Sequence, residues 1–142
     1  MVVRVARLGI RGRLQRLDTT ADHQLRVPAD PRRVGWWSGG ALPGARGSTV
    51  LAGHVDGPAG PAVFNRLQFA RRGDLITISR RGHHALRYRV TAVREYPKGR
   101  LPRQLVFGAS RTNRLRLVTC GGRFNAAIGS YDDNIVVYAS LI

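Results

Sequence analysis

The feature of this sequence that most constrains its fold is a series of short runs, most of them bordered by glycine or proline, in which apolar and polar residues alternate or apolar residues follow one another. A period of two places successive side chains on opposite faces of a strand and predicts a half-buried β-strand, whereas a short apolar run such as 49–52 predicts a buried one. The 142 residues include 17 glycines and 7 prolines, which is typical of many short strands joined by tight turns. The runs that predict strands are 2–8, 10–14, 25–27, 49–52, 75–78, 86–93, 115–119 and 135–139.

Helical patterns are scarce. Asp30-Pro31 is typical of a helix N-cap followed by proline at the first helical position, which predicts one helical turn through Val34. Residues 60–67 predict a second short helix, and residues 102–106 predict a third turn. Seven or eight strands with small helices in their connections favour a mainly β protein, a compact barrel. Since neither a linker nor an internal repeat interrupts the pattern, we expect one domain over residues 1–142.

The chain is strongly basic, with a formal net charge of +16 at pH 7. Such a field attracts nucleic acid, anionic lipid or a polyanionic cell wall, so a basic nucleic-acid-binding barrel is one hypothesis. The basic residues are dispersed and contain no run of five like charges, which is typical of a solvated surface. Only 8 residues are acidic, too few and too scattered to predict an oxygen cage for calcium. We therefore expect no metal and no cofactor.

Cys120 is the only cysteine. It excludes an intrachain disulfide and a thiolate-rich zinc site, and it leaves either a buried small hydrophobe or a reactive thiol. The sequence has no apolar stretch long enough to span a membrane and no charged-then-apolar leader. These patterns by themselves predict a cytosolic protein or a soluble part of a larger one.

Two predicted strands lead to a residue with a reactive side chain, and each of these residues has a glycine next to it. His54 comes after the run 49–52 and Gly53, and Cys120 ends the run 115–119 and precedes Gly121. Strand ends present side chains to clefts from a rigid base, and a cysteine and a histidine so placed can act as a nucleophile and its proton partner. Spacing alone leaves the alternative open that His54 is a structural histidine and Cys120 a packing residue.

The residues around these two positions are similar to those of a known family. Leu117-Val118-Thr119-Cys120 resembles the nucleophile signature of sortases, and Leu51-Ala52-Gly53-His54 resembles their histidine segment. Further segments resemble the class F sortases of actinobacteria, and the resemblance runs from about Val2 to Leu141. These segments are 25–37, 52–56, 60–64, 96–98, 120–122 and 131–139.

The resemblance implies a closed eight-stranded sortase barrel and a cysteine transpeptidase or hydrolase of Gram-positive bacteria. Such an enzyme cleaves a sorting signal of the Leu-Pro-X-Thr-Gly type between threonine and glycine through a thioacyl intermediate. It then transfers the surface protein to an amine of a peptidoglycan precursor or of a pilin. The resemblance also implies an extracellular enzyme held to the membrane by an N-terminal anchor that this sequence lacks, acting as a monomer with no nucleic-acid partner.

Cys120 matches the family's nucleophile and His54 its acid and base, but the third catalytic residue departs from the pattern. Most sortases carry an arginine at the start of the last strand, where this sequence has Asn134. Alternation places Arg116 on the face of the strand that carries Cys120, so we expect Arg116 to supply the guanidinium. Arg123 and an amide donor at Asn134 are the alternatives. An inactive sortase-like domain is a further hypothesis, because the usual arginine is missing.

The remaining candidate site residues lie next to the catalytic pair. Asp56 follows His54 by two residues and is placed either to orient the imidazole or to cap the next turn. We expect four residues to contact the substrate, namely Asn134, Thr119, Asp56 and Arg123.

Overall fold

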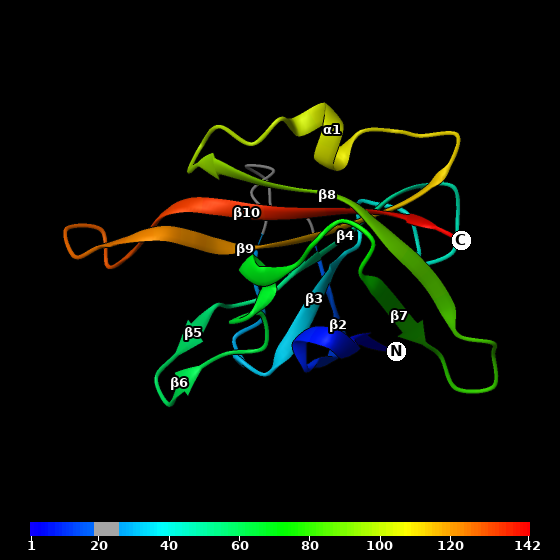
Figure 1. Cartoon of the computed structure of the whole chain (residues 1–142), viewed down its shortest axis with the longest axis horizontal. Helices are drawn as coiled ribbons and strands as arrows, with labels where there is room; N and C mark the ends of the chain where they lie inside the picture. The colour runs from blue at the N-terminus through cyan, green and yellow to red at the C-terminus, as the bar shows by residue number, and fades with distance from the viewer. Residues whose placement is uncertain (19–25) are drawn as a thin grey trace.

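The structure, a computed structural model, describes residues 1–18 and 26–142 and is built around a closed barrel of eight strands (Figure 1). In spatial order the strands are β1 (Val2–Val5), β2 (Ile10–Leu17), β3 (Arg33–Trp37), β4 (Gly47–Ala52), β9 (Asn113–Asn125), β10 (Ser130–Leu141), β8 (Leu86–Pro97) and β7 (Leu75–Ser79). Pairing of β1 with β7 closes the barrel, and the pairs β2–β3 and β4–β9 are parallel. The expected mainly β, eight-stranded barrel is confirmed.

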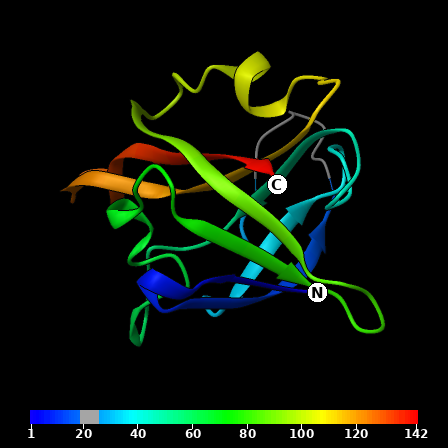
Figure 2. The same ribbon diagram turned by 45° about the vertical axis from the view of Figure 1, so that its right-hand side comes forward.

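The other elements lie in the connections. A two-stranded ribbon of β5 (Asp56–Gly57) and β6 (Gly60–Pro61) follows β4, and the 3₁₀ helices are η1 (Ala6–Leu8) and η2 (Leu67–Phe69). The helix α1 (Arg103–Phe107) belongs to the connection between β8 and β9 and lies outside the barrel in both views (Figures 1 and 2). Of the helices in residues 1–18 and 26–142, none is long and apolar enough to cross a membrane.

Tertiary pairing overrides three of the local predictions. The predicted turn through Val34 is wrong, because residues 33–37 form β3 and pair in parallel with β2. The helix predicted at 60–67 is also wrong: β6 occupies its start, and the amide of Phe64 donates to the carbonyl of His54, so this segment docks beside β4. The run 2–8 is a strand only to Val5 and continues as η1.

The other predicted segments fare differently. Residue 25 of the strand predicted at 25–27 lies outside the described residues, and residues 26 and 27 are not part of a strand. The turn predicted at 102–106 is confirmed as α1.

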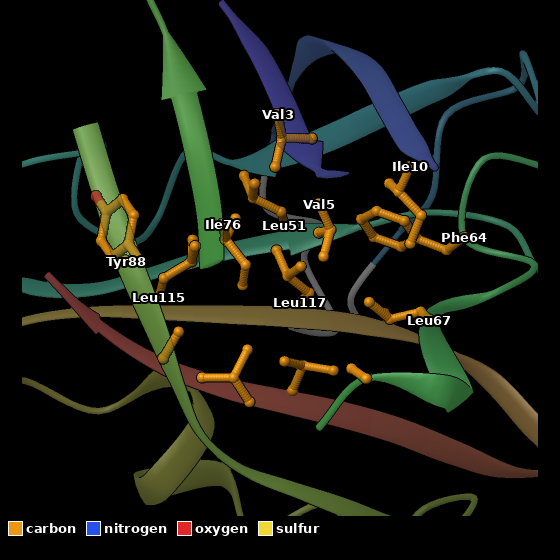
Figure 3. Packing of buried hydrophobic residues seen from close by; sticks show 14 of the residues in the cluster. Val3, Val5, Ile10, Leu51, Phe64, Leu67, Ile76, Tyr88, Leu115 and Leu117 are labelled. Atoms are coloured by element: carbon orange, nitrogen blue, oxygen red, sulfur yellow. The ribbon is translucent and has the colours of Figure 1, made fainter. Parts of the chain in front are cut away.

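The barrel interior holds the main hydrophobic core (Figure 3). Inward positions alternate along each strand, so Leu115 and Leu117 of β9 point into the core and are fully buried. A second apolar cluster covers the outer face of β9 and β10, where Val118 and Val136 pack with Val106 of α1. The middle of β9 is therefore buried on both faces, which gives the end of this strand a rigid base.

An ion pair fixes the edge where the barrel closes. Nε and Nη2 of Arg7 in η1 donate to the two carboxylate oxygens of Asp74 at 2.6 and 2.7 Å, and the amide of Arg71 donates to the same carboxylate at 2.8 Å. Hydrogen bonds from Arg7 lower the pKa of Asp74 below its usual value. The pair joins the segment after β1 to the turn that opens β7.

Candidate active site

The end of β4 lies beside the middle of β9 because the two strands are parallel neighbours, with Ala52 opposite Val118. Beyond that pair, the amide of Gly53 donates to the carbonyl of Val118 at 3.2 Å. The hydroxyl of Thr119 donates to the carbonyl of Gly53 at 2.8 Å, and its side chain is buried. His54 follows the end of β4 by two residues, and Cys120 directly follows Thr119 within β9. The expectation that Cys120 ends a strand is wrong, because pairing with β10 continues β9 past it to Asn125.

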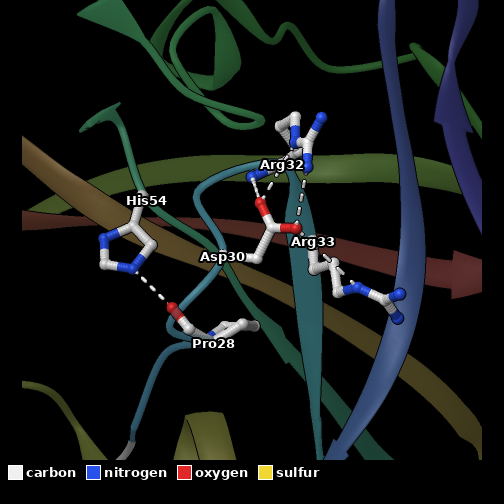
Figure 4. Close-up of polar contacts among 5 residues, drawn as sticks. All are labelled: Pro28, Asp30, Arg32, Arg33 and His54. Carbon is white, nitrogen blue, oxygen red and sulfur yellow. Dashed lines mark hydrogen bonds and ion pairs between the residues drawn. The ribbon is translucent and has the colours of Figure 1, made fainter. Parts of the chain in front are cut away.

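A backbone carbonyl holds the His54 imidazole. Nε2 of His54 lies 2.7 Å from the carbonyl oxygen of Pro28, and Figure 4 shows the ring turned toward it. Because a carbonyl oxygen only accepts, Nε2 carries the proton in the neutral ring and Nδ1 is left to exchange one. This arrangement selects one of the two tautomers of the imidazole.

The segment that supplies this carbonyl is fixed by a turn. The Asp30 carboxylate accepts from the Arg32 amide at 2.9 Å and lies within 3.3 and 3.9 Å of the Arg32 and Arg33 guanidinium nitrogens (Figure 4). The backbone hydrogen bond from Arg32 is the main cause that lowers the pKa of Asp30. The Asp30 turn holds the chain where Pro28 meets the histidine.

Half-buried Cys120 opens into a cavity of about 550 Å³ on the outer face of the barrel. The apolar walls include Val118 of β9 together with Leu101 and Phe107 from the β8–β9 connection. Among the described residues, the charged side chains that line it are the cationic Lys98 and Arg103, and none is acidic. The cavity thus combines a thiol, an apolar surface and positive charge, which suits an extended peptide that develops negative charge at a reacting carbonyl.

Asn134 lies opposite Cys120 in the β9–β10 register and lines the same cavity. Directly opposed residues on antiparallel strands have Cβ atoms about 4.5–5.5 Å apart. The structure therefore brings together Cys120, Asn134 and Thr119, three of the residues identified from the sequence.

Arg103 is a cavity residue that the sequence reasoning missed. It lies in α1, lines the Cys120 cavity and holds its guanidinium carbon 5.0 Å from the centre of the Phe107 ring. The sequence predicted the turn at 102–106, but nothing in it shows that this turn lies over the end of β9. The Pro28 carbonyl was missed as well, because a backbone acceptor leaves no sequence signal.

The expected position of Arg116 is wrong. Alternation does place Arg116 on the same face as Val118, but α1 covers it: its Nε donates to the carbonyl of Leu105 at 3.1 Å. The side chain is only 4% exposed, its guanidinium carbon lies 4.7 Å from the centre of the Tyr138 ring, and it lines a different cavity. Four residues of strand separate it from Cys120 by about 13 Å. This geometry does not support Arg116 as an oxyanion donor.

Arg123 and Asp56 also lie away from their expected contacts. Arg123 is exposed and does not line the Cys120 cavity. The Asp56 carboxylate accepts from the Tyr131 hydroxyl and, at 3.3 Å, from the Asn65 amide, whereas the His54 imidazole is held by Pro28.

Asp56 instead forms a bridge between β5 and β10. The hydrogen bond to Asp56 raises the pKa of Tyr131, and the nearby Cys120 adds to this rise. The Asp56–Tyr131 bridge therefore lies beside the thiol.

No group of three or more His, Cys, Asp or Glu side chains suited to a metal ion occurs within residues 1–18 and 26–142.

The fold and site define a class of proteins: closed β-barrels in which a cysteine on one strand and a histidine just after the neighbouring strand follow a bonded pair of residues. The sortase-domain family model matches residues 4–142. The chain belongs to the sortase family. No curated protein matches it in sequence.

Solved sortase structures share the fold. The lid mutant of sortase A from Corynebacterium diphtheriae superposes with a TM-score of 0.76 at 19% identity, over 99% of this chain and 68% of that one. The sortase D5 transpeptidase of Clostridium perfringens gives 0.74 at 20% identity, over 99% and 77%. Sortase C-1 from Actinomyces oris gives 0.74 at 18% identity, over 99% and 72%. Neighbours from three sortase classes thus share this barrel.

Proposed function

We propose that this protein is a class F sortase, a cysteine transpeptidase that cleaves a Leu-Pro-X-Thr-Gly signal between threonine and glycine. The observation that carries the proposal is the pairing of β4 with β9, which joins Gly53 and Thr119, the residues directly before His54 and Cys120, beside a cavity of about 550 Å³ that Cys120 lines. The segments of resemblance to class F, such as 131–139, support the class.

In the first half of the reaction Nδ1 of His54 takes the proton of the Cys120 thiol, and the resulting thiolate attacks the threonine carbonyl and forms a tetrahedral oxyanion. His54 gives the Nδ1 proton to the departing glycine amine as the peptide bond breaks, which leaves a thioester on Cys120. In the second half Nδ1 takes a proton from the incoming amine as the amine attacks the thioester, and Cys120 leaves as the thiolate when the new amide bond forms. The Nε2 hydrogen bond to Pro28 leaves Nδ1 in the exchanging role.

Asn134 and Arg103 are the proposed oxyanion donors. Both line the cavity into which Cys120 opens, one from β10 and one from α1. An amide and a guanidinium from two elements supply the charge stabilisation that most sortases obtain from one arginine on the last strand. Removal of one oxyanion donor typically costs about 10²–10³ in rate.

The proposed substrates are secreted proteins that carry the sorting signal, and the proposed acceptor is an amine of a peptidoglycan precursor or of a pilin. Such substrates place the enzyme at the outer face of the cell membrane of a Gram-positive bacterium. The formal net charge of +16 supports this location, because an anionic cell wall attracts a cationic protein.

The test is the capture of a thioacyl adduct on Cys120. The protein is incubated with Leu-Pro-X-Thr-Gly peptides that vary at X, and its intact mass is measured with and without an added amine. We expect a mass increase equal to the acyl fragment, loss of that increase on adding amine, and no adduct with Cys120→Ala.

Iodoacetamide labelling of Cys120 in the same sample shows that the thiol is intact and accessible. A labelled protein that forms no adduct with any peptide would refute the proposal and favour an inactive sortase-like domain. Tight, salt-sensitive binding of an oligonucleotide by such an inactive protein would favour the nucleic-acid-binding barrel.

A further inference from the structure

The outer face of β8, β9 and β10 carries a second cavity, which α1 divides from the first. Leu105 of α1 lines the second cavity, whereas Arg103 and Phe107 line the first. The second cavity has a volume of about 350 Å³, and the described residues that line it include three arginines, two residues with aliphatic hydroxyls and no acidic residue. These polar residues are Arg94, Arg114, Arg116, Thr91 and Ser140.

Arg116 forms the buried base of this cavity. Its hydrogen bonds go to the carbonyls of Leu105 and Leu115, and its guanidinium lies over the Tyr138 ring. Among the described residues, none of the ion pairs includes Arg116. A buried cation normally pairs with an anion, since carbonyl dipoles and an aromatic face offset only part of the cost of its desolvation.

The charges around Arg116 agree with its lack of an ion pair among the described residues. Burial lowers the pKa of Arg116 to about 10, and the like charge of Arg114 contributes in the same direction. Arg114 follows the same face of β9 and lies opposite Ser140, while Arg116 lies opposite Tyr138. Positive charge is therefore concentrated where the protein provides no carboxylate among the lining residues.

We propose that this second cavity binds a phosphate group, as a phosphate ester or a pyrophosphate. Three guanidinium forks offer more donors than the two oxygens of a carboxylate can accept, and they match the several oxygens of a phosphate. The hydroxyl of Ser140 adds a donor, while the hydroxyl of Thr91 donates to the carbonyl of Tyr138 at 3.3 Å. The volume accommodates a phosphate together with part of the group that it is attached to.

The test compares two neutral substitutions that change the net charge equally. Arg114→Gln removes a cavity arginine, and Arg111→Gln removes an exposed arginine outside the cavity. Neither variant changes Arg116, because the loss of a buried side chain would also affect folding. Binding of inorganic pyrophosphate is measured by isothermal titration calorimetry at constant ionic strength, with circular dichroism as the check of folding.

We expect saturable binding by the parent protein, an affinity at least about tenfold weaker for Arg114→Gln, and a change within about twofold for Arg111→Gln. Equal weakening in the two variants would show that pyrophosphate responds only to net charge and would overturn the proposal. Absence of saturable binding by the parent protein would overturn it as well.

A second arm distinguishes the two sources of a phosphate. The same variants are tested on neutral phosphatidylcholine vesicles with and without phosphatidylglycerol. If the ligand is a lipid headgroup, Arg114→Gln weakens vesicle binding more than Arg111→Gln does, and pyrophosphate competes. If the ligand is soluble, the two variants bind vesicles alike while only Arg114→Gln loses pyrophosphate. Either result supports a phosphate site and identifies its source.

Discussion

Thr119→Val tests how the strand that carries Cys120 is held against the strand that carries His54. The substitution keeps the shape of the side chain and deletes the hydroxyl that donates to the Gly53 carbonyl at 2.8 Å. Both partners are buried, so the carbonyl is left without that donor. Loss of such a bond costs about 1–3 kcal/mol of the free energy of unfolding.

The catalytic effect should exceed the effect on stability. Gly53 directly precedes His54, and Thr119 directly precedes Cys120, so a shift at this bond changes the position of the acid–base relative to the nucleophile. A displacement of about 1 Å between reacting groups costs on the order of 10²-fold in rate. We therefore expect kcat/KM for peptide cleavage to fall by about 10–10²-fold, with the fold kept.

Thr49→Val is the matched control. Thr49 is also buried and donates to a backbone carbonyl, that of Ala41, at 2.9 Å, but it lies within β4 away from Cys120. Urea denaturation should show a similar loss of stability in the two variants, whereas the cleavage rate of Thr49→Val should stay within about threefold of the parent. Equal losses of cleavage in the two variants, or full activity of Thr119→Val, would refute a positioning role for this hydrogen bond.

Three further predictions concern other parts of the molecule. Cys120→Ala should abolish peptide cleavage in a chain that still folds, measured by product formation and circular dichroism; turnover within about tenfold of the parent would contradict a thiol nucleophile. Arg103→Ala and Asn134→Ala should each lower kcat/KM by about 10²-fold, and Arg103→Lys should lower it by less. The exposed control Arg100→Ala should keep kcat/KM near that of the parent. Equal values for Arg103→Ala and Arg100→Ala would contradict a role of Arg103 as an oxyanion donor. Because the pKa of Asp74 is lowered in the folded state, its carboxylate stabilises the fold above the pKa of the unfolded chain, and this contribution is lost as the pH falls below about 4. The difference in free energy of unfolding between the parent and Asp74→Asn should therefore shrink between about pH 6 and about pH 3, and a constant difference would contradict the assigned pairing.

Local alternation was enough to predict most of the barrel, because a strand with one face in the core must alternate wherever it lies. β3 was missed because the N-cap and proline signal at Asp30-Pro31 is real but ends after one turn, and pairing with β2 then determines the conformation. The helix predicted at 60–67 failed for the same reason, since the amides of Ala62 and Phe64 donate to Val55 and His54 after β4, and bonds within the segment form only single turns.

The candidate site was predictable only as far as strand faces determine it. Cys120 and Asn134 are placed by alternation and by their pairing across β9 and β10. Arg116 obeys the same alternation, yet α1 covers it, and no local pattern encodes where a short helix in a connection will lie. Arg103 enters the cavity for the same reason that Arg116 is excluded from it.

The bond between Thr119 and Gly53 joins residues 66 positions apart in the chain. Contacts of such long sequence separation form late in folding, after the loop-closure entropy between them has been overcome. Parallel pairing of β4 with β9 adds a crossover of about the same length, which makes this edge of the barrel among the slowest parts to assemble. While the chain is still folding, Cys120 is an ordinary thiol without its histidine, so the reactive pair forms only when the barrel around it is nearly complete.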